Sequence, residues 1–133
     1  MLRDQIQSIL KERYGSISFE FGGPSESVVR VASCCQDIGE LQIYDDGDEA
    51  TIYVTEVTHG HFNPYDATQG EAELVQWIVD EVVEFLDALF EDRVLLYRSP
   101  DRGMGGWIMF DDAIDKSEMV AGREYFVWSG PVA

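Results

Sequence analysis

The sequence predicts an α+β fold, in which an antiparallel β-sheet arranged as a meander carries an N-terminal helix and one long central helix packed on one face. Two segments, one at the start and one in the middle, repeat their hydrophobic residues at helical spacing. The segments around them alternate hydrophobic and polar residues with a period of two, which is typical of strands. At 133 residues and 45% hydrophobic content, the chain is expected to form a single globular domain over residues 1–133.

The N-terminal third is predicted to contain one helix and two strands. The helix covers residues 2–14, where hydrophobic side chains fall on one face, and Gly15 ends it. The period then changes to two over residues 17–21, which indicates a strand. The segment "GGPSES" turns the chain, and residues 28–33 form a second strand.

A β-hairpin is predicted next, with strands at residues 40–45 and 49–58 joined through Asp46-Gly47. The predicted pairs are Tyr44 with Glu49, Ile43 with Ala50, and Leu41 with Ile52. This register places the apolar side chains of both strands on one face. A slip of one residue would destroy that segregation, which is why the register is preferred.

A long helix is predicted over residues 69–92, because Thr68 and Glu71 form a T-x-x-E capping box at its start. Three further strands are expected at residues 93–99, 107–110 and 123–128, with a short helix in the segment 111–122 that ends at Gly122.

The charge balance is unusual, with 26 acidic and 9 basic residues and a formal net charge of −17. Nucleic acid and anionic membranes need clustered cations on a protein, so neither is an expected partner. A basic protein partner or a divalent cation would be attracted. No secretory pattern or membrane-length apolar run is present, and Cys34 and Cys35 are adjacent and poorly placed to pair with each other. A cytoplasmic, bacterial protein is therefore expected.

Sequence patterns for common enzyme classes are absent. The chain has no phosphate-binding G-x-x-x-x-G-K segment, no C-x-x-C pair and no G-x-S-x-G nucleophile turn. The acidic segment "DDGDE" lacks the spacing of a calcium loop and is explained by the hairpin turn. No catalytic residue is therefore assigned, and a non-enzymatic protein is favoured over an enzyme.

Both histidines lie in the segment "THGHFNPYD". In a strand, His59 and His61 would point to the same side, and Asp66 or Glu56 could add oxygen ligands, so a divalent metal site at His59, His61 and Asp66 is one interpretation. The alternative is that Gly60 breaks the strand and the histidines end the sheet where the chain turns toward the long helix. A pH-responsive contact is also consistent with the pattern.

The long helix carries a stripe of acids opposite its apolar face, and no lysine or arginine occurs between residues 70 and 92. Trp77 falls outside the apolar face and beside these acids, where it is either a binding residue or covered by a loop. The predicted partner-binding residues are Trp77, Glu73, Asp80, Glu81, Glu84, Asp87 and Glu91.

Size and charge favour a non-enzymatic binding or inhibitory protein that docks on a basic protein partner, and a toxin-neutralising protein of the immunity type is its concrete form. The alternative is a metal-binding protein or small metal-dependent enzyme that uses the His59-x-His61 segment. A third interpretation is a homo-oligomer that associates through sheet edges.

Overall fold

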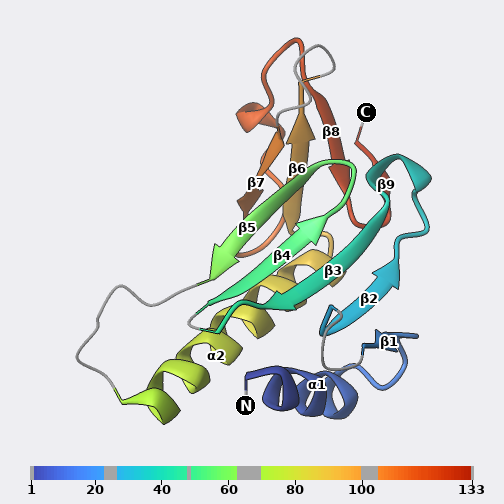
Figure 1. Ribbon diagram of the computed structural model, residues 1–133. Coiled ribbons are helices and arrows are strands. Elements are labelled where there is room, and N and C mark those ends of the chain that lie inside the picture. The colour runs from blue at the N-terminus through green and yellow to red at the C-terminus, as the bar shows by residue number, and fades with distance from the viewer. Residues whose placement is uncertain (1, 23–26, 48, 63–69, 100–104, 133) are drawn as a thin grey trace.

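The computed structural model describes residues 2–22, 27–47, 49–62, 70–99 and 105–132. It confirms the α+β fold class: within these residues the chain forms helices α1 (Leu2–Arg13) and α2 (Glu71–Phe90), two antiparallel sheets and two short 3₁₀ helices (Figure 1).

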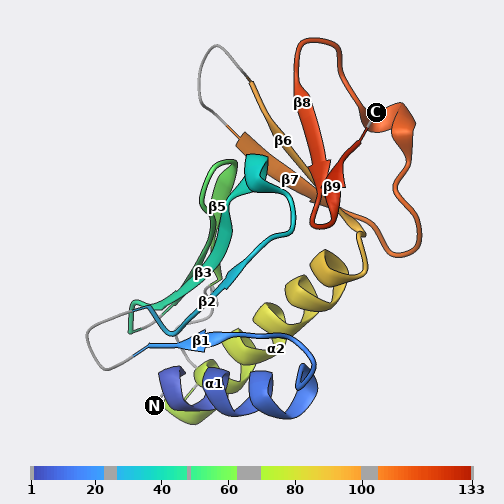
Figure 2. The same ribbon diagram turned by 90° about the vertical axis from the view of Figure 1, so that its right-hand side faces the viewer.

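The N-terminal half forms a five-stranded meander with the strand order β1-β2-β3-β4-β5. Its strands are β1 (Glu20–Phe21), β2 (Val29–Ala32), β3 (Glu40–Asp45), β4 (Ala50–Val54) and β5 (Thr58–Phe62). The 3₁₀ helix η1 (Gln36–Ile38) connects β2 to β3. In Figure 2 this sheet is seen nearly edge-on, with α2 on one side of it.

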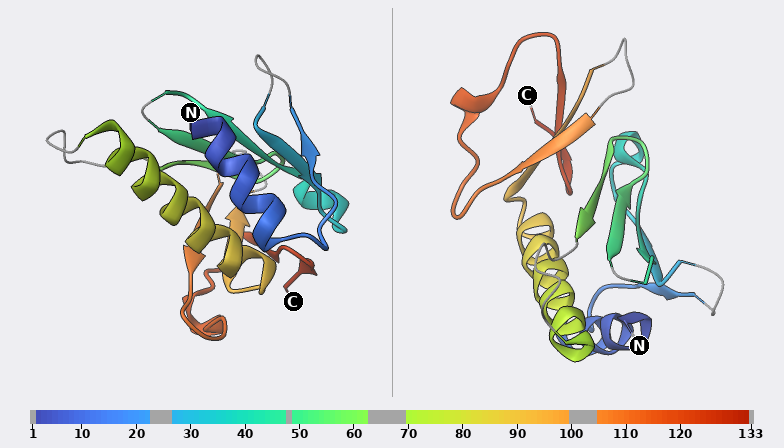
Figure 3. Two further views of the ribbon diagram at one scale, coloured as in Figure 1. Left: turned by 90° about the horizontal axis from the view of Figure 1, so that it is seen from below. Right: turned by 60° about the vertical axis from the view of Figure 1, so that its left-hand side comes forward.

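One face of this sheet is buried against the helices. Its side chains on β3 and β4 are Leu41, Ile43, Ala50, Ile52 and Val54, all at most 2% exposed. α1 contributes Leu2, Ile6 and Leu10 to the same core. α1 also contacts α2, which lies alongside it in Figure 3. The hydrophobic residues that alternate along the strands and those that repeat at helical spacing on α1 therefore pack into one core.

The C-terminal third forms a four-stranded antiparallel sheet with the order β7-β6-β8-β9. Its strands are β6 (Val94–Arg98), β7 (Gly105–Met109), β8 (Glu124–Val127) and β9 (Gly130–Pro131). The short helix predicted before the last strand is present as the 3₁₀ helix η2 (Lys116–Glu118). The strand β9 was not predicted.

The two sheets and α2 meet at a cluster of three aromatic rings. Phe62 of β5 lies 5.5 Å from Phe85 of α2, and Phe85 lies 5.3 Å from Trp107 of β7, measured between ring centroids. Trp107 covers Gly60, where an added Cβ would lie 2.0 Å from Cη2 of the indole. Gly60 is therefore the position at which β5 accommodates a side chain from the second sheet.

Arg98 of β6 also joins the two sheets. Its Nη1 donates to the carbonyl oxygens of Asp37 at 2.7 Å and Glu56 at 2.9 Å, while Nε donates to Glu124 of β8 at 3.1 Å. One guanidinium thus satisfies two backbone acceptors of the first sheet's connections and a carboxylate of the second sheet.

The hairpin register differs from the prediction by two residues. Ile43 pairs with Ile52 and Asp45 pairs with Ala50. The amide of Asp46 donates to the carbonyl of Glu49 at 3.0 Å, and Gly47 has a φ of 91°, so the turn is displaced by one residue. A shift of two residues keeps every side chain on its face, and the facial pattern therefore could not discriminate between the two registers.

Other element boundaries also differ. The strand predicted at residues 49–58 ends at Val54, because residues 55–57 form a turn and the chain returns as β5, which begins at Thr58. The strand predicted at residues 17–21 is reduced to β1. The predicted capping box depends on Thr68, which lies outside the described residues; the residue before α2 is Gly70, which makes no side-chain cap. In the described part of the chain, neither helix has the length and apolar composition needed to cross a membrane.

Candidate functional site

The outer face of the five-stranded sheet, opposite the helices, brings together polar and aromatic side chains from β3, β4 and β5. Strand pairing aligns them in two rows. The first row is Gln42, Tyr53 and His59, and the second is Tyr44, Thr51 and His61. Because β5 continues through Gly60, His59 and His61 lie on the same side of the sheet, as the H-x-H spacing predicts for a strand.

Four rings on this face are in contact. Tyr44 lies 5.6 Å from Tyr53, Tyr53 stacks on His59 at 5.3 Å, and His59 meets His61 edge-on at 5.3 Å. His59 is thereby held between two aromatic neighbours, Tyr53 and His61.

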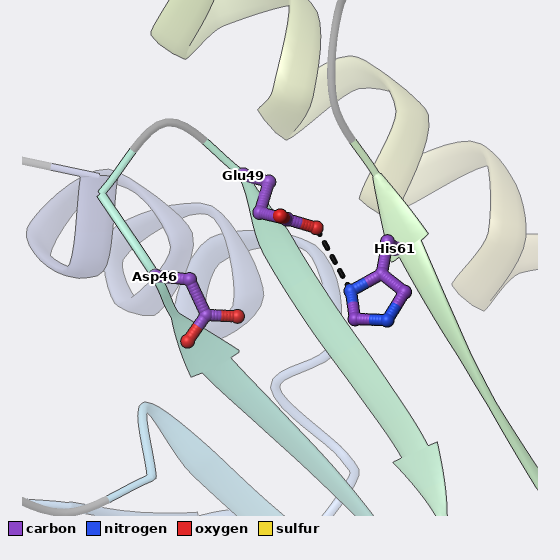
Figure 4. Close-up of side chains that lie close together, drawn as sticks. All are labelled: Asp46, Glu49 and His61. Atoms are coloured by element: carbon purple, nitrogen blue, oxygen red, sulfur yellow. Dashed lines mark ion pairs between the residues drawn. The ribbon is translucent and has the colours of Figure 1, made fainter.

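At one end of the ring row, His61 lies beside two carboxylates that flank the β3–β4 turn (Figure 4). His61 Nδ1 is 2.8 Å from Oε2 of Glu49 and 3.1 Å from the hydroxyl oxygen of Thr51. The Thr51 hydroxyl donates to Oδ2 of Asp46. One ligand atom each from Asp46, Glu49 and His61 lie within 4.8 Å of one another. We call these three residues the DEH cluster.

The DEH cluster is partly shielded from solvent. The side chain of Glu49 is 25% exposed, and its Oε2 has almost no accessible surface and no hydrogen bond of acceptable geometry. Nδ1 of His61 approaches that oxygen at 2.8 Å. A buried carboxylate oxygen is costly unless a proton or a cation compensates it.

A hollow of about 310 Å³ lies next to the DEH cluster. It is lined by Gln42, Tyr44, Asp46, Thr51 and Tyr53. Asp46 belongs to both features, and Thr51 of the lining lies 3.1 Å from His61, so a small ligand in the hollow would contact the cluster. The remaining lining groups are a tyrosine pair and an amide that accepts from Tyr44 Oη at 3.0 Å.

Nucleophilic catalysis is not supported by this geometry. In a hydroxyl–histidine–carboxylate triad, the hydroxyl and the carboxylate contact different ring nitrogens. Here Thr51 and Glu49 both approach Nδ1 of His61. The arrangement suits a bound cation or a fixed hydrogen-bond network instead.

The metal ligands proposed from the sequence are only partly brought together. His61 is in the DEH cluster, whereas His59 stacks on Tyr53, and Asp66 lies outside the described residues. Asp46 and Glu49 were missed as partners of His61. Their positions at the two sides of a tight turn were the available signal, but only the pairing of β4 with β5 shows that His61 lies beside them.

The second candidate surface is the acidic face of α2. Glu73, Asp80, Glu84 and Glu91 are exposed, while Trp77, Glu81 and Asp87 are half-buried. Trp77 packs partly against the hydrophobic core, so it is neither fully exposed nor fully covered. The carboxylates of Glu73, Asp80, Glu81 and Glu84 surround it at positions i−4, i+3, i+4 and i+7.

The acids near the C-terminal end of α2 have basic partners. Asp87 accepts from Arg13 Nε at 3.0 Å and from the hydroxyl of Tyr14 at 2.5 Å. The Arg13 guanidinium, bonded to the carboxylate, lowers the pKa of Asp87. Glu91 pairs with Arg93 Nε at 2.9 Å. Asp87 and Glu91 therefore contribute to the structure, which the sequence of α2 alone did not reveal.

The acids earlier in α2 remain without a cationic partner. Among the described residues, no ion pair reaches Glu73, Asp80, Glu81 or Glu84; Asp80 accepts only from the Gln76 amide at 2.8 Å. Partial burial, reinforced by the charges of Glu84 and Asp80, raises the pKa of Glu81. The negative field around Trp77 is thus not neutralised within this part of the molecule.

Comparisons with protein-family models, with curated proteins and with solved structures gave no match to this chain.

Proposed function

We propose that this protein is a non-enzymatic acidic binding protein that docks on a basic protein partner through the N-terminal two-thirds of α2. The observation that carries the proposal is the group of four carboxylates around the half-buried Trp77, which have no cationic partner among the described residues. We call Glu73, Trp77, Asp80, Glu81 and Glu84 the α2 acidic surface.

The chemistry of this surface suits a lysine- or arginine-rich partner. An aromatic ring with a rim of carboxylates offers a cation–π contact and charge-assisted hydrogen bonds to the same guanidinium or ammonium group. Like charges at i and i+4 oppose helix stability slightly, and an incoming cation would relieve that repulsion. The net charge of −17 would also speed the encounter with a basic partner.

A toxin-neutralising protein of the immunity type is the most specific form of this function, because a small acidic domain suits a cationic nuclease cleft. A cytoplasmic location is part of the proposal. It is supported by Cys34 and Cys35, which are both free thiols, the first exposed with Sγ 3.3 Å from the carbonyl of Ser129 and the second buried.

The test is capture of partners from native lysate with three immobilised proteins. These are the wild type, a variant with Glu73→Gln, Asp80→Asn and Glu84→Gln, and a control variant with Asp111→Asn, Asp112→Asn and Glu118→Gln. Both variants lose three exposed carboxylates, and the control positions lie far along the chain from α2. Comparing the two variants therefore distinguishes the effect of the α2 acidic surface on partner binding from the effect of a lower net charge.

We expect a basic protein to be retained by the wild type and the control at about 0.1 M salt and released at about 1 M, as the Debye length falls from about 10 Å to about 3 Å. The α2 variant should bind roughly tenfold more weakly, since three exposed ion pairs are worth about 0.5 kcal/mol each. Equal losses in both variants, or retention only of acidic proteins, would refute the proposal.

A further inference from the structure

We propose that the DEH cluster, Asp46, Glu49 and His61, is a binding site for a divalent transition-metal ion, with Zn²⁺ as the preferred ion. This inference is independent of the α2 acidic surface, since it concerns the opposite face of the five-stranded sheet.

The possible ligand atoms of Asp46, Glu49 and His61 lie close together. Two carboxylates and an imidazole come from the two sides of the β3–β4 turn and from β5, and their nearest ligand atoms lie within 4.8 Å of one another. Ligands bound at about 2.1 Å from one zinc ion lie about 3 to 4 Å apart. Small rotations of exposed side chains would therefore complete the site without moving the strands.

The carboxylate of Glu49 is shielded from solvent and lies against the imidazole of His61. Thr51 has a single hydroxyl proton, which it donates to Asp46, so it cannot also donate to Nδ1 of His61. Oε2 of Glu49 is closed off from solvent and accepts no hydrogen bond of acceptable geometry, yet it faces Nδ1 at 2.8 Å. A metal ion shared by Nδ1 of His61 and Oε2 of Glu49 would compensate the charge of this shielded carboxylate oxygen.

The ligand types of the DEH cluster favour zinc over calcium or magnesium. Imidazole nitrogen is a ligand for zinc and other borderline metals, whereas Ca²⁺ and Mg²⁺ prefer oxygen ligands alone. Three protein ligands leave at least one coordination position open. His61 is 51% exposed and Asp46 borders the 310 Å³ hollow, so water or a small ligand could occupy that position.

The site differs from the one expected from the H-x-H spacing. In the described part of the chain, His59 does not belong to the DEH cluster and stacks on Tyr53 instead. His59 therefore provides a matched control: the same residue type on the same face of the same strand, two positions from His61.

The experiment is titration of untagged, metal-free protein with Zn²⁺ by isothermal calorimetry, in parallel with Ca²⁺ and Mg²⁺. The variants are His61→Ala, Glu49→Gln and the control His59→Ala, with circular dichroism to verify that each is folded. An additional control, Asp80→Asn with Glu84→Gln, measures any adventitious binding to the α2 acidic surface.

We expect one Zn²⁺ per chain, at least tenfold weaker binding in His61→Ala and Glu49→Gln, and near wild-type binding in both controls. Co²⁺ should give a visible absorption band in the wild type that is lost in His61→Ala. Three outcomes would each overturn the assignment: no stoichiometric Zn²⁺, equally tight binding of Ca²⁺, or a loss in His59→Ala as large as in His61→Ala.

Discussion

Replacing Gly60 by alanine tests whether β5 continues through this residue, because the two alternatives predict stability changes of opposite sign. One of the two interpretations from the sequence has Gly60 break the strand, and replacing this glycine by alanine would then stabilise the protein by about 0.5 to 1 kcal/mol. In the structure, Gly60 lies within β5 opposite Ile52, and an added Cβ would lie 2.0 Å from Cη2 and 2.7 Å from Cζ3 of Trp107. Gly60→Ala should therefore be destabilising.

The magnitude follows from the packing of the indole. Trp107 contacts Phe62 at 6.3 Å and Phe85 at 5.3 Å between centroids, so the ring cannot rotate away freely. Overpacking of this kind costs about 2 kcal/mol, which exceeds the entropic gain and leaves a net loss of roughly 1 to 1.5 kcal/mol. With an unfolding entropy of about 280 cal/mol/K for a chain of this length, the Tm should fall by about 4 to 5 °C.

Thermal and urea unfolding, followed by circular dichroism and tryptophan fluorescence, measure this change. Gly15→Ala is the control, because its Cβ would meet only the Lys11 carbonyl oxygen at an ordinary 3.7 Å. In a double-mutant cycle, Trp107→Leu should remove most of the cost of Gly60→Ala. A rise in Tm for Gly60→Ala, or additive effects in the cycle, would refute the packing of β5 against the second sheet.

Three further substitutions test other contacts. Asp87→Asn should lower the Tm near neutral pH by a few degrees, whereas Glu84→Gln one turn earlier should not. Because the folded-state pKa of Asp87 is lowered, the stability that Asp87 contributes is present above its unfolded pKa of about 3.9 and disappears as the pH falls through the folded pKa. Thermal melts at several pH values would measure this loss. Asp45→Ala should cost about 1 to 2 kcal/mol in urea unfolding, because Asp45 accepts from the Arg3 amide at the start of α1 and from the Gly47 amide. Arg98→Gln should cost about 2 kcal/mol and increase amide hydrogen exchange where the two sheets meet, since it leaves two backbone carbonyls without their donor.

The elements that were predicted well depend on local patterns. The buried face of α2 and its acidic stripe follow from spacing along one helix, and the hydrophobic face of the β3–β4 hairpin follows from alternation on two neighbouring strands. The register of that hairpin did not follow, because patterns of period two are unchanged by a shift of two residues. Deciding between the registers requires the turn itself.

The parts that were missed depend on contacts between distant residues. β5 was not predicted as a separate strand, and one of the two interpretations of the histidine segment ended the strand at Gly60, because the side chain that fills the space above this glycine comes from Trp107, on another sheet. Likewise, Asp87 was assigned to the partner-binding stripe, since nothing within α2 indicates that Arg13 and Tyr14 bind it. No periodicity argument within one element can detect such a partner.

The candidate metal site also depends on contacts between residues that are distant in the sequence, and it lies apart from the α2 acidic surface. Sequence spacing led to His59 as the partner of His61, because the two are near in the chain, whereas strand pairing brings His61 to Asp46 and Glu49. The DEH cluster lies on the outer face of the five-stranded sheet, and α2 packs on the other side. At 0.1 M salt, screening limits the influence of a cation at the DEH cluster to about 10 Å, and the sheet lies between this cluster and α2. Zn²⁺ and a basic protein partner are therefore expected to bind independently, and partner capture with and without Zn²⁺ should give the same retention.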